Sequence, residues 1–340
     1  MRKKEILARC LTYMFPQSFL LKLRSLFINE ITVLAYHRIS DVQDEDEYEF
    51  DMELISASCA QFDEQIKYIK QNYNPISIEE FVAFTEGKFE LPKRSVLITF
   101  DDGFIDNYEN AYPILKRHNV PAVIYISTEY INTDDTIWFD KLVFLIKSIN
   151  DMTLNIDDLG KEYVLSENNR GTVATKICSD LKTVPNKSRI KILNELNEKY
   201  GQELKSKSTL KSRMMSWDNV REMDESCISF GSHTVSHPIL SQLTDVELSE
   251  ELEESKRDIE KNLNHVVDTI SYPVGDSNAF NDRVLNATKK AGYKVGFSYI
   301  SGKERLPIEN VFDIKRLHVE RYNSYHFFRS MLNLPGFFKD

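Results

Sequence analysis

The chain has 340 residues, 41% of them hydrophobic, and a formal net charge of −10 at pH 7. These values are those of a soluble globular chain that can bury a substantial core. An acidic surface would repel phosphates, so a nucleic-acid partner is excluded. The cysteines show no paired spacing, which argues against a disulfide framework and a cysteine metal site and favours a reducing compartment. They are Cys10, Cys59, Cys178 and Cys227.

Residues 1–30 form a basic amphipathic segment. Three basic residues at 2–4 precede apolar stretches that charged and polar residues interrupt. The segment therefore lacks the continuous apolar core of a signal peptide, and it is too broken to cross a bilayer. It could lie on an anionic membrane surface or pack against the domain, and the sequence leaves both open. A cytoplasmic location is expected, with membrane-surface contact as an option.

Apolar runs alternate with helical patterns along the rest of the chain, which indicates a parallel β/α architecture. Two capping boxes predict helix starts, Ser77-x-x-Glu80 and Thr244-x-x-Glu247, and an apolar stripe that begins at Val246 should pack the second helix outside the sheet. About seven strands are predicted, few enough to suggest an incomplete barrel. They are 31–37, 95–101, 121–127, 227–232, 267–272, 293–298 and 311–319.

The interval 135–215 is longer than a minimal domain of this kind requires. It alternates polar helical stretches with weak turn signals, so we expect an insertion. Trp138 and Trp217 flank it. Sugars bind aromatic faces, which would allow a lid or subsite role, although the reading that both tryptophans anchor the core is slightly favoured.

Two motifs carry chemistry. Residues 99–103 read TFDDG and place Asp101 and Asp102 at the end of a predicted buried strand, while residues 233–237 read HTVSH. On a helical turn, His233 and His237 would share one face, and a carboxylate could complete an open three-ligand site for a divalent metal. The other carboxylate would then be the natural general base. Taken singly, each motif also has a plain explanation, a strand-to-turn signal or a coincidental histidine pair.

Together the two motifs resemble those of the polysaccharide deacetylases of carbohydrate esterase family four, also called the NodB homology domain. That family reads TFDDG and H-[ST]-x-x-H, and the resemblance runs from about Thr32 to about Val319, including the LAYHRI stretch at 34–39. It implies a deacetylase domain over 31–335, with the insertion at about 135–215. The implied fold is a distorted (β/α)7 barrel related to the TIM barrel, with site residues at the carboxyl ends of strands.

The resemblance implies a metal-dependent deacetylase that hydrolyses N-acetyl groups of a poly- or oligosaccharide containing N-acetylglucosamine. Asp102, His233 and His237 would hold one divalent metal. Two imidazoles and a carboxylate favour Zn²⁺, although Co²⁺, Ni²⁺ or Fe²⁺ accept the same ligands. The ion would polarise the N-acetyl carbonyl, and Asp101 would act as base on a metal-bound water.

The third family motif usually reads R-x-P-Y-G and resembles SYPVG at 271–275. Ser271 stands where the family has an arginine beside the catalytic aspartate, so the orientation of Asp101 is left open. The backbone N–H of Val274 is the candidate oxyanion donor. The Tyr-Pro-x-Gly form resembles deacetylases of exported or lipid-linked N-acetylglucosamine polymers. The predicted substrate-binding residues are Tyr272, Pro273, Val274 and Gly275.

A general acid must protonate the leaving amine, and the family supplies a histidine from an L-x-H element on the last strand. The late match is His318, within Arg316-Leu317-His318-Val319, where Leu317 and His318 are adjacent. His37, at the end of the first predicted strand, is the rival. A histidine that closes an apolar strand is more often a hydrogen-bonded structural residue, so both assignments stay open.

Two alternative functions remain at the level of the sequence. One is a carbohydrate-binding relative that has lost turnover, although a binder has no need of a base beside a metal ligand. The other is a metal-dependent hydrolase of a small non-sugar amide. The expected partner in the main reading is an N-acetylated polysaccharide or oligosaccharide, and no pattern indicates the oligomeric state.

Overall fold

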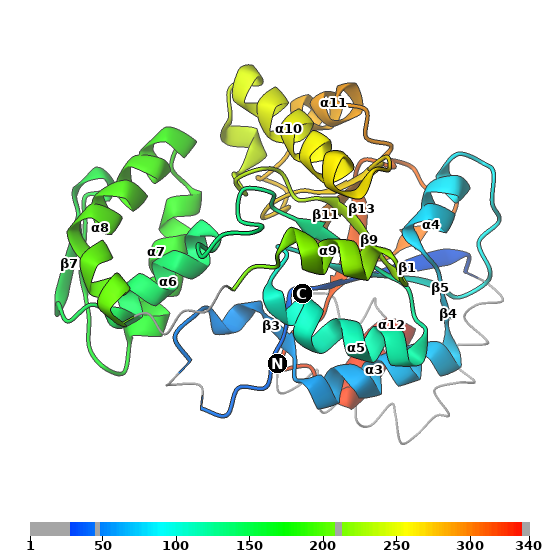
Figure 1. Ribbon diagram of the computed structural model, residues 1–340, viewed down its shortest axis with the longest axis horizontal. Coiled ribbons are helices and arrows are strands. Elements are labelled where there is room, and N and C mark those ends of the chain that lie inside the picture. Colours follow the sequence, from blue (N-terminus) through cyan, green and yellow to red (C-terminus); the bar gives the residue numbers. More distant parts are fainter. Residues whose placement is uncertain (1–27, 45–47, 208–212, 335–340) are drawn as a thin grey trace.

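The computed structural model describes residues 28–44, 48–207 and 213–334, and its centre is a closed barrel of seven parallel strands (Figure 1). The closure occurs where β5 pairs with β1. Around the barrel the order is β1 (Glu30–Tyr36), β13 (Ile314–His318), β11 (Val295–Ser301), β10 (Thr269–Ser271), β9 (Ile228–Ser232), β6 (Ala122–Ile126) and β5 (Ser95–Phe100). These are the seven predicted strands, so the (β/α)7 barrel is confirmed, and the suggestion that the barrel is incomplete is wrong.

The barrel is distorted at two joints. Strands β9 and β10 share one registered pair, Ser232 with Ile270. Between β11 and β13 the register shifts from Phe297 to Ser301, an irregularity that re-aims side chains at a barrel rim. Short strands that the apolar pattern did not reveal extend or flank the barrel. They are β12 (Glu304–Arg305), antiparallel to β1, β4 (Asn74–Pro75), beside β5, and the pair β2 (Arg38–Ile39) and β3 (Ile55–Ala57).

Helices cover the outside of the barrel (Figure 1). Both predicted capping boxes are present, because the Ser77 and Thr244 side chains accept from the backbone N–H three residues on. In α10 three leucine and isoleucine side chains of the predicted stripe are buried, but Val246 is 67% exposed. The helices are α3 (Cys59–Asn72), α4 (Ile78–Thr85), α5 (Tyr112–His118), α9 (Trp217–Asp224), α10 (Asp245–Leu263), α11 (Asp282–Lys290) and α12 (Tyr325–Asn333).

A separate helical unit, residues 138–207, stands beside the barrel at the left of Figure 1 and is called the side unit below. It falls within the interval expected to be an insertion. Most of its buried side chains belong to a hydrophobic cluster distinct from the one around the barrel, and Trp138 is part of it, whereas Trp217 packs against the barrel cluster. Its elements are α6 (Trp138–Ser148), β7 (Thr153–Ile156), β8 (Lys161–Val164), α7 (Arg170–Lys182) and α8 (Asn186–Lys207).

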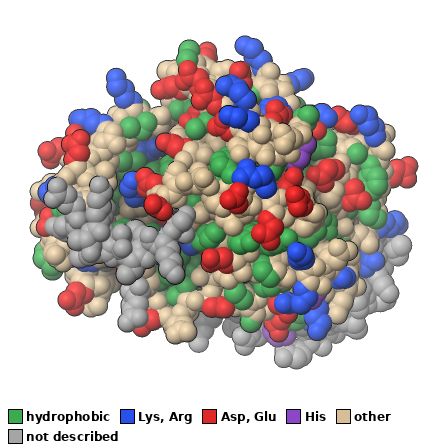
Figure 2. Space-filling view, in the orientation of Figure 1, with side chains coloured by type: hydrophobic (Ala, Val, Ile, Leu, Met, Phe, Trp, Pro, Cys, Tyr) green, Lys and Arg blue, Asp and Glu red, His purple; other side chains and the backbone are tan. Residues whose placement is uncertain are grey.

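The surface carries both signs of charge. Acidic and basic side chains are interspersed over the face in Figure 2. Among the described residues no helix is long and apolar enough to cross a membrane. The amphipathic segment predicted at 1–30 lies almost wholly outside them, as does Cys10, while the other three cysteines are free thiols.

Candidate active site

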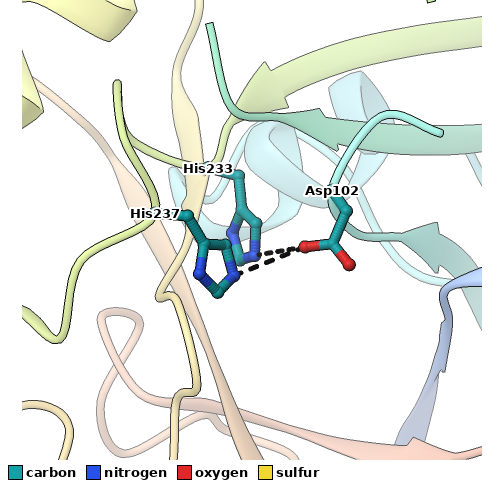
Figure 3. Close-up of side chains that lie close together, drawn as sticks. All are labelled: Asp102, His233 and His237. Carbon is teal, nitrogen blue, oxygen red and sulfur yellow. Dashed lines mark ion pairs between the residues drawn. The ribbon is translucent and has the colours of Figure 1, made fainter. Parts of the chain in front are cut away.

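Three buried side chains converge at the carboxyl ends of the barrel strands (Figure 3). Asp102 follows β5, and its Oδ1 lies 3.4 Å from Nε2 of His233 and 3.4 Å from Nε2 of His237. The predicted ligand set is therefore brought together, with its ligand atoms within 4.8 Å of one another. The expected helical turn is wrong, because 233–237 is a loop in which Thr234 and His237 have φ of 67° and 57°.

Local hydrogen bonds hold this histidine loop, residues 233–237. The Thr234 hydroxyl accepts from the backbone N–H of His237 at 3.2 Å. Glu251, on α10, accepts from the backbone N–H of Val235 at 2.8 Å and of Ser236 at 3.0 Å, and it also accepts from the Ser236 hydroxyl. The capped helix α10 thus supplies the carboxylate that fixes the loop, and so positions His237, a predicted metal ligand, indirectly.

The donors of this cluster fit a divalent metal. Both carboxylate oxygens of Asp102 are buried without a hydrogen-bond partner, an expensive arrangement unless a cation is bound. His233 Nδ1 lies 2.7 Å from the Ser271 carbonyl oxygen, which can only accept, so Nε2 keeps its lone pair for a metal. Burial lowers the pKa of His237 to about 4, which keeps this ring neutral. Burial would also lower the pKa of His233, but the carboxylates of Asp101 and Asp102 outweigh it and raise this pKa, so a metal at its Nε2 would bind in competition with a proton. One carboxylate and two imidazoles can form an open three-ligand site.

Asp101, the predicted base, is held by an arginine from the opposite end of the sequence. Arg316 of β13 donates from Nη1 to Oδ1 at 2.9 Å and from Nη2 to Oδ2 at 2.7 Å. The guanidinium is fully buried and also donates to the Ser271 hydroxyl and the Ser298 carbonyl. Burial would raise the pKa of Asp101, but Arg316 outweighs it and holds the pKa below the ordinary value. Asp101 is therefore ionised and oriented at neutral pH.

Sequence reasoning missed this role of Arg316. It looked for the arginine beside Ser271, where the family motif has it, and left the orientation of Asp101 open. A signal was available on β13 itself, because Arg316 and His318 are two positions apart and so point to the same side of the strand.

The two candidate acids lie on neighbouring strands. His318 ends β13 and pairs in register with Ala35 of β1. His37 follows Ala35 by two residues along the chain. The His318 ring stacks on Tyr299 with centroids 3.5 Å apart and planes 4° apart, and His37 meets the same tyrosine edge-on at 5.5 Å. His318 Nε2 is buried without a hydrogen-bond partner. Burial, then Arg316, lowers the pKa of His318 to about 3, so this imidazole is neutral at neutral pH.

The third motif contributes backbone rather than the tyrosine side chain. Tyr272 is fully buried, stacks on Phe280 and donates its hydroxyl to the Phe312 carbonyl at 3.0 Å. This corrects the expectation that Tyr272 binds substrate, since its side chain is committed to the core. The motif alone does not show that Phe280 packs against the Tyr272 ring.

The turn after Tyr272 is tight. Val274 and Gly275 have φ of 62° and 58°, and a Cβ at position 275 would lie 2.7 Å from the backbone nitrogen of Tyr299, so only glycine fits there. The Gly275 N–H bonds to the Pro273 carbonyl. A β-branched residue such as Val274 rarely adopts this backbone, and strain of this kind gathers at functional sites. Its N–H remains the predicted oxyanion donor.

Comparison with known proteins gives a consistent family. The family model for polysaccharide deacetylase matches residues 88–296, more than half of the chain. The chain is 26% identical over 300 residues to the poly-β-1,6-N-acetyl-D-glucosamine N-deacetylase of Staphylococcus aureus (strain MRSA252), covering 85% of this chain and 78% of that protein. It is 23% identical over 268 residues to YxkH of Bacillus subtilis (strain 168), covering 78% of this chain but only 63% of that protein.

Solved structures share the fold. The Streptococcus pyogenes deacetylase PplD in complex with acetate aligns with a TM-score of 0.58 and 22% identity, over 88% of this chain and 96% of that one. IcaB from Ammonifex degensii aligns with a TM-score of 0.57 and 16% identity, over 90% and 97%. The family match, the barrel and the two motifs together show that this chain belongs to the polysaccharide deacetylase family, whose members are hydrolases acting on carbon–nitrogen bonds.

Proposed function

We propose that the chain is a metal-dependent N-deacetylase of a poly- or oligosaccharide that contains N-acetylglucosamine. The observation that carries this is the pair of adjacent carboxylates, Asp102 unpartnered beside two imidazoles and Asp101 ionised beside Arg316. The name of the S. aureus relative supports the substrate class.

Asp102, His233 and His237 would hold the ion, with Zn²⁺ favoured and Co²⁺, Ni²⁺ or Fe²⁺ compatible with the same donors. When bound, the metal would polarise the N-acetyl carbonyl and make a water more acidic. Asp101 accepts the proton of the attacking water, and Arg316 keeps this carboxylate ionised and fixed in direction. The Val274 N–H, in the turn where Val274 has a positive φ, is the proposed donor to the developing oxyanion.

Collapse of the tetrahedral species breaks the carbon–nitrogen bond, releases acetate and requires a proton on the amine. His318 is the proposed donor, with His37 as the alternative. Because the His318 pKa is about 3, its ring is neutral before reaction, so the proton that it delivers must reach it during the cycle. Asp101 takes this proton from the attacking water and passes it to His318, which passes it to the amine. Stacking on Tyr299 holds the ring in place for this transfer.

The test is metal analysis together with acetate release. The purified chain should bind about one divalent metal, and His233→Ala and His237→Ala should each lose it, because three ligands are the minimum of such a site. His265→Ala is the matched control, since His265 is partly exposed and pairs with Asp224 rather than with the cluster. Undiminished metal in both ligand variants would overturn the metal site.

The substrate panel separates the alternatives. Acetate should be released from N-acetylglucosamine oligomers. Release only from small non-sugar amides would favour the amide hydrolase, and saccharide binding without any release would favour the carbohydrate-binding relative.

A further inference from the structure

A cavity of about 330 Å³ lies between the side unit and the barrel. Its walls come from α6, from α8, from the loop after β6 and from Ser236 of the histidine loop. Trp138 and Arg189, 8% and 2% exposed, are among its buried members. Exposed polar side chains contribute the outer wall, and they are Glu129, Asp135, Asn194 and Asn197.

Arg189 is a buried cation without an acidic partner. Its guanidinium carbon lies 5.0 Å from the centre of the Trp138 ring, and Nη2 donates to the Asn186 side chain. Nη1 is buried without a hydrogen-bond partner, and Arg189 forms no ion pair with any carboxylate in the described part of the chain. Burial lowers the pKa of Arg189 to about 10, which still leaves it charged at neutral pH. A buried donor of this kind gains most from a ligand that accepts a hydrogen bond.

The surroundings of Arg189 select the chemistry of that ligand. Glu129 and Asp135 add two carboxylates to the same cavity, and Lys141, which pairs with Asp135 at 2.7 Å, adds a second cation, so the charges of the lining balance and favour no ion. A neutral compound with many hydroxyls can use the guanidinium donor and the carboxylate and amide groups together. The volume is in the range of small-molecule sites, which begins at about 300 Å³. These features fit a sugar unit.

The cavity adjoins the metal cluster through the histidine loop. The Trp138 indole N–H donates to the His237 carbonyl at 3.2 Å, and the Tyr130 hydroxyl donates to the Ser236 carbonyl at 3.3 Å. Phe139 meets the His237 ring with centroids 5.2 Å apart. The side unit that forms the cavity therefore also supports a metal ligand.

We propose that this cavity is a remote glycan subsite, which binds a sugar unit of the same saccharide chain whose N-acetyl group lies at Asp101 and Asp102. The inference rests on the proposed function. It assigns a role to the side unit beyond its contacts with His237, and makes the chain selective for saccharides long enough to reach both places.

Binding is measured with Trp138 as the reporter. The chain has two tryptophans, so a Trp217→Phe background leaves Trp138 as the sole source of indole fluorescence. N-acetylglucosamine oligomers of increasing length are titrated into this protein with Asp101→Asn added to prevent turnover. Long oligomers should change the emission, and Arg189→Met should weaken their binding by about tenfold, the loss expected for one hydrogen bond to a charged group.

Lys191→Met is the matched control, because Lys191 lies on the same helix but is exposed and pairs with Asp158 outside the cavity. It should bind long oligomers like the parent. If Arg189→Met fails to fold, Asn194→Ala at the exposed wall replaces it with the same expected direction. Equal binding by the cavity variant and the control would overturn the subsite. A response to acetate or inorganic phosphate, with none to oligomers, would overturn it in favour of an anion site.

Kinetics separate this proposal from the deacetylase function itself. In an otherwise unaltered chain, Arg189→Met should raise KM for long oligomers by about tenfold and leave kcat/KM for the shortest substrate unchanged. An equal loss on short and long substrates would refute a remote subsite while the deacetylase function stands. Oligomer binding at Trp138 without acetate release from any saccharide would refute the deacetylase function while the subsite stands.

Discussion

Two adjacent carboxylates in the candidate active site differ in their hydrogen-bond partners. Asp101 and Asp102 are both almost fully buried, at 2% and 1% exposure. Arg316 binds both oxygens of Asp101, whereas neither oxygen of Asp102 has a hydrogen-bond partner. A carboxylate whose charge is balanced within the protein is fixed in direction and ionisation, while an unbalanced one depends on a bound cation. The side of the site that holds Asp101, called the base side, is thus complete in the protein alone, whereas the side that holds Asp102, called the metal side, would be completed by a bound cation.

The largest expected effect comes from Asp101→Asn. The amide keeps the shape of the side chain and can still accept from Arg316, but it removes the base, so deacetylation should fall by about 10²- to 10⁴-fold. Metal content should be unchanged, because Asp101 lies outside the ligand set. Acetate release and metal analysis check both, with Asp218→Asn, 89% exposed at its side chain, as the control. Activity within a few-fold of the parent would remove Asp101 from the role of base.

Arg316→Met tests whether Arg316 balances the charge of Asp101. It leaves a buried carboxylate uncompensated, which should lower the free energy of unfolding by about 3–5 kcal/mol. In the parent, the Asp101 pKa lies below 3.8, so its stabilising contribution is present above that pH and is lost as the pH falls through the lower folded value. In the variant burial should instead raise the pKa of Asp101, so the acid limb of kcat/KM should move to higher pH.

Urea unfolding and pH–rate profiles measure the two effects of Arg316→Met. Arg316→Lys, which keeps one charged donor, should recover part of both. An acid limb that stays at the parental pH in Arg316→Met would show that this arginine does not set the ionisation of Asp101.

The parts of the site that follow from local sequence could be predicted. Apolar runs predicted all seven barrel strands, because that signal is carried by neighbouring residues. The two motifs predicted the grouping of Asp102, His233 and His237 through the family that they resemble. The Arg316–Asp101 pair joins residues 215 positions apart, and the local pattern on β13 shows that Arg316 and His318 share a side of the strand but not that Arg316 reaches Asp101. The contact depends on the closure of the barrel, in which β1 lies between β5 and β13.

Backbone conformation and side-chain direction also could not be predicted from the sequence. Equal histidine spacing is compatible with a helical turn and with the observed loop, and the left-handed backbone of Thr234 and His237 decides between them. Tyr272 looked like a substrate contact because its motif is functional, yet its ring has the burial of a core residue. The side unit falls within the interval that was predicted to be an insertion, but its cavity depends on packing between α6 and α8 that separate helices do not reveal.

The acid assignment can be sharpened with His318→Ala and His37→Ala. His318→Ala should lower kcat by about 100-fold, the lower end of general acid–base effects. Because the free ring is uncharged above pH about 3, the alkaline limb of kcat/KM should persist in this variant. His37→Ala should lower kcat less. A larger kcat loss in His37→Ala than in His318→Ala would move the acid role to His37.

The smallest expected effect concerns the support of the metal side. Glu251→Gln weakens the acceptor that holds the histidine loop without touching a ligand, so metal affinity should fall by about tenfold. Competition with a chelator measures this. Glu250→Gln, an exposed neighbour on α10, is the control and should bind metal like the parent. Equal affinity in both variants would mean that the loop keeps its shape without Glu251.

The joint between β9 and β10 has a consequence for motion. These strands share one registered pair, fewer than any other neighbours in the closed barrel, and the imidazole of His233 bridges them by bonding to the Ser271 carbonyl. The His233 ring nitrogen thus links β9 to β10 where other neighbouring strands of the barrel have a second backbone hydrogen bond. Local opening of a protein starts where few backbone bonds must break, so amide hydrogen exchange should be fastest at this joint among the barrel strands. Each such opening would displace His233, a proposed metal ligand, and disturb the Ser271 hydroxyl that Arg316 binds, so opening at this one joint would disturb both sides of the site together.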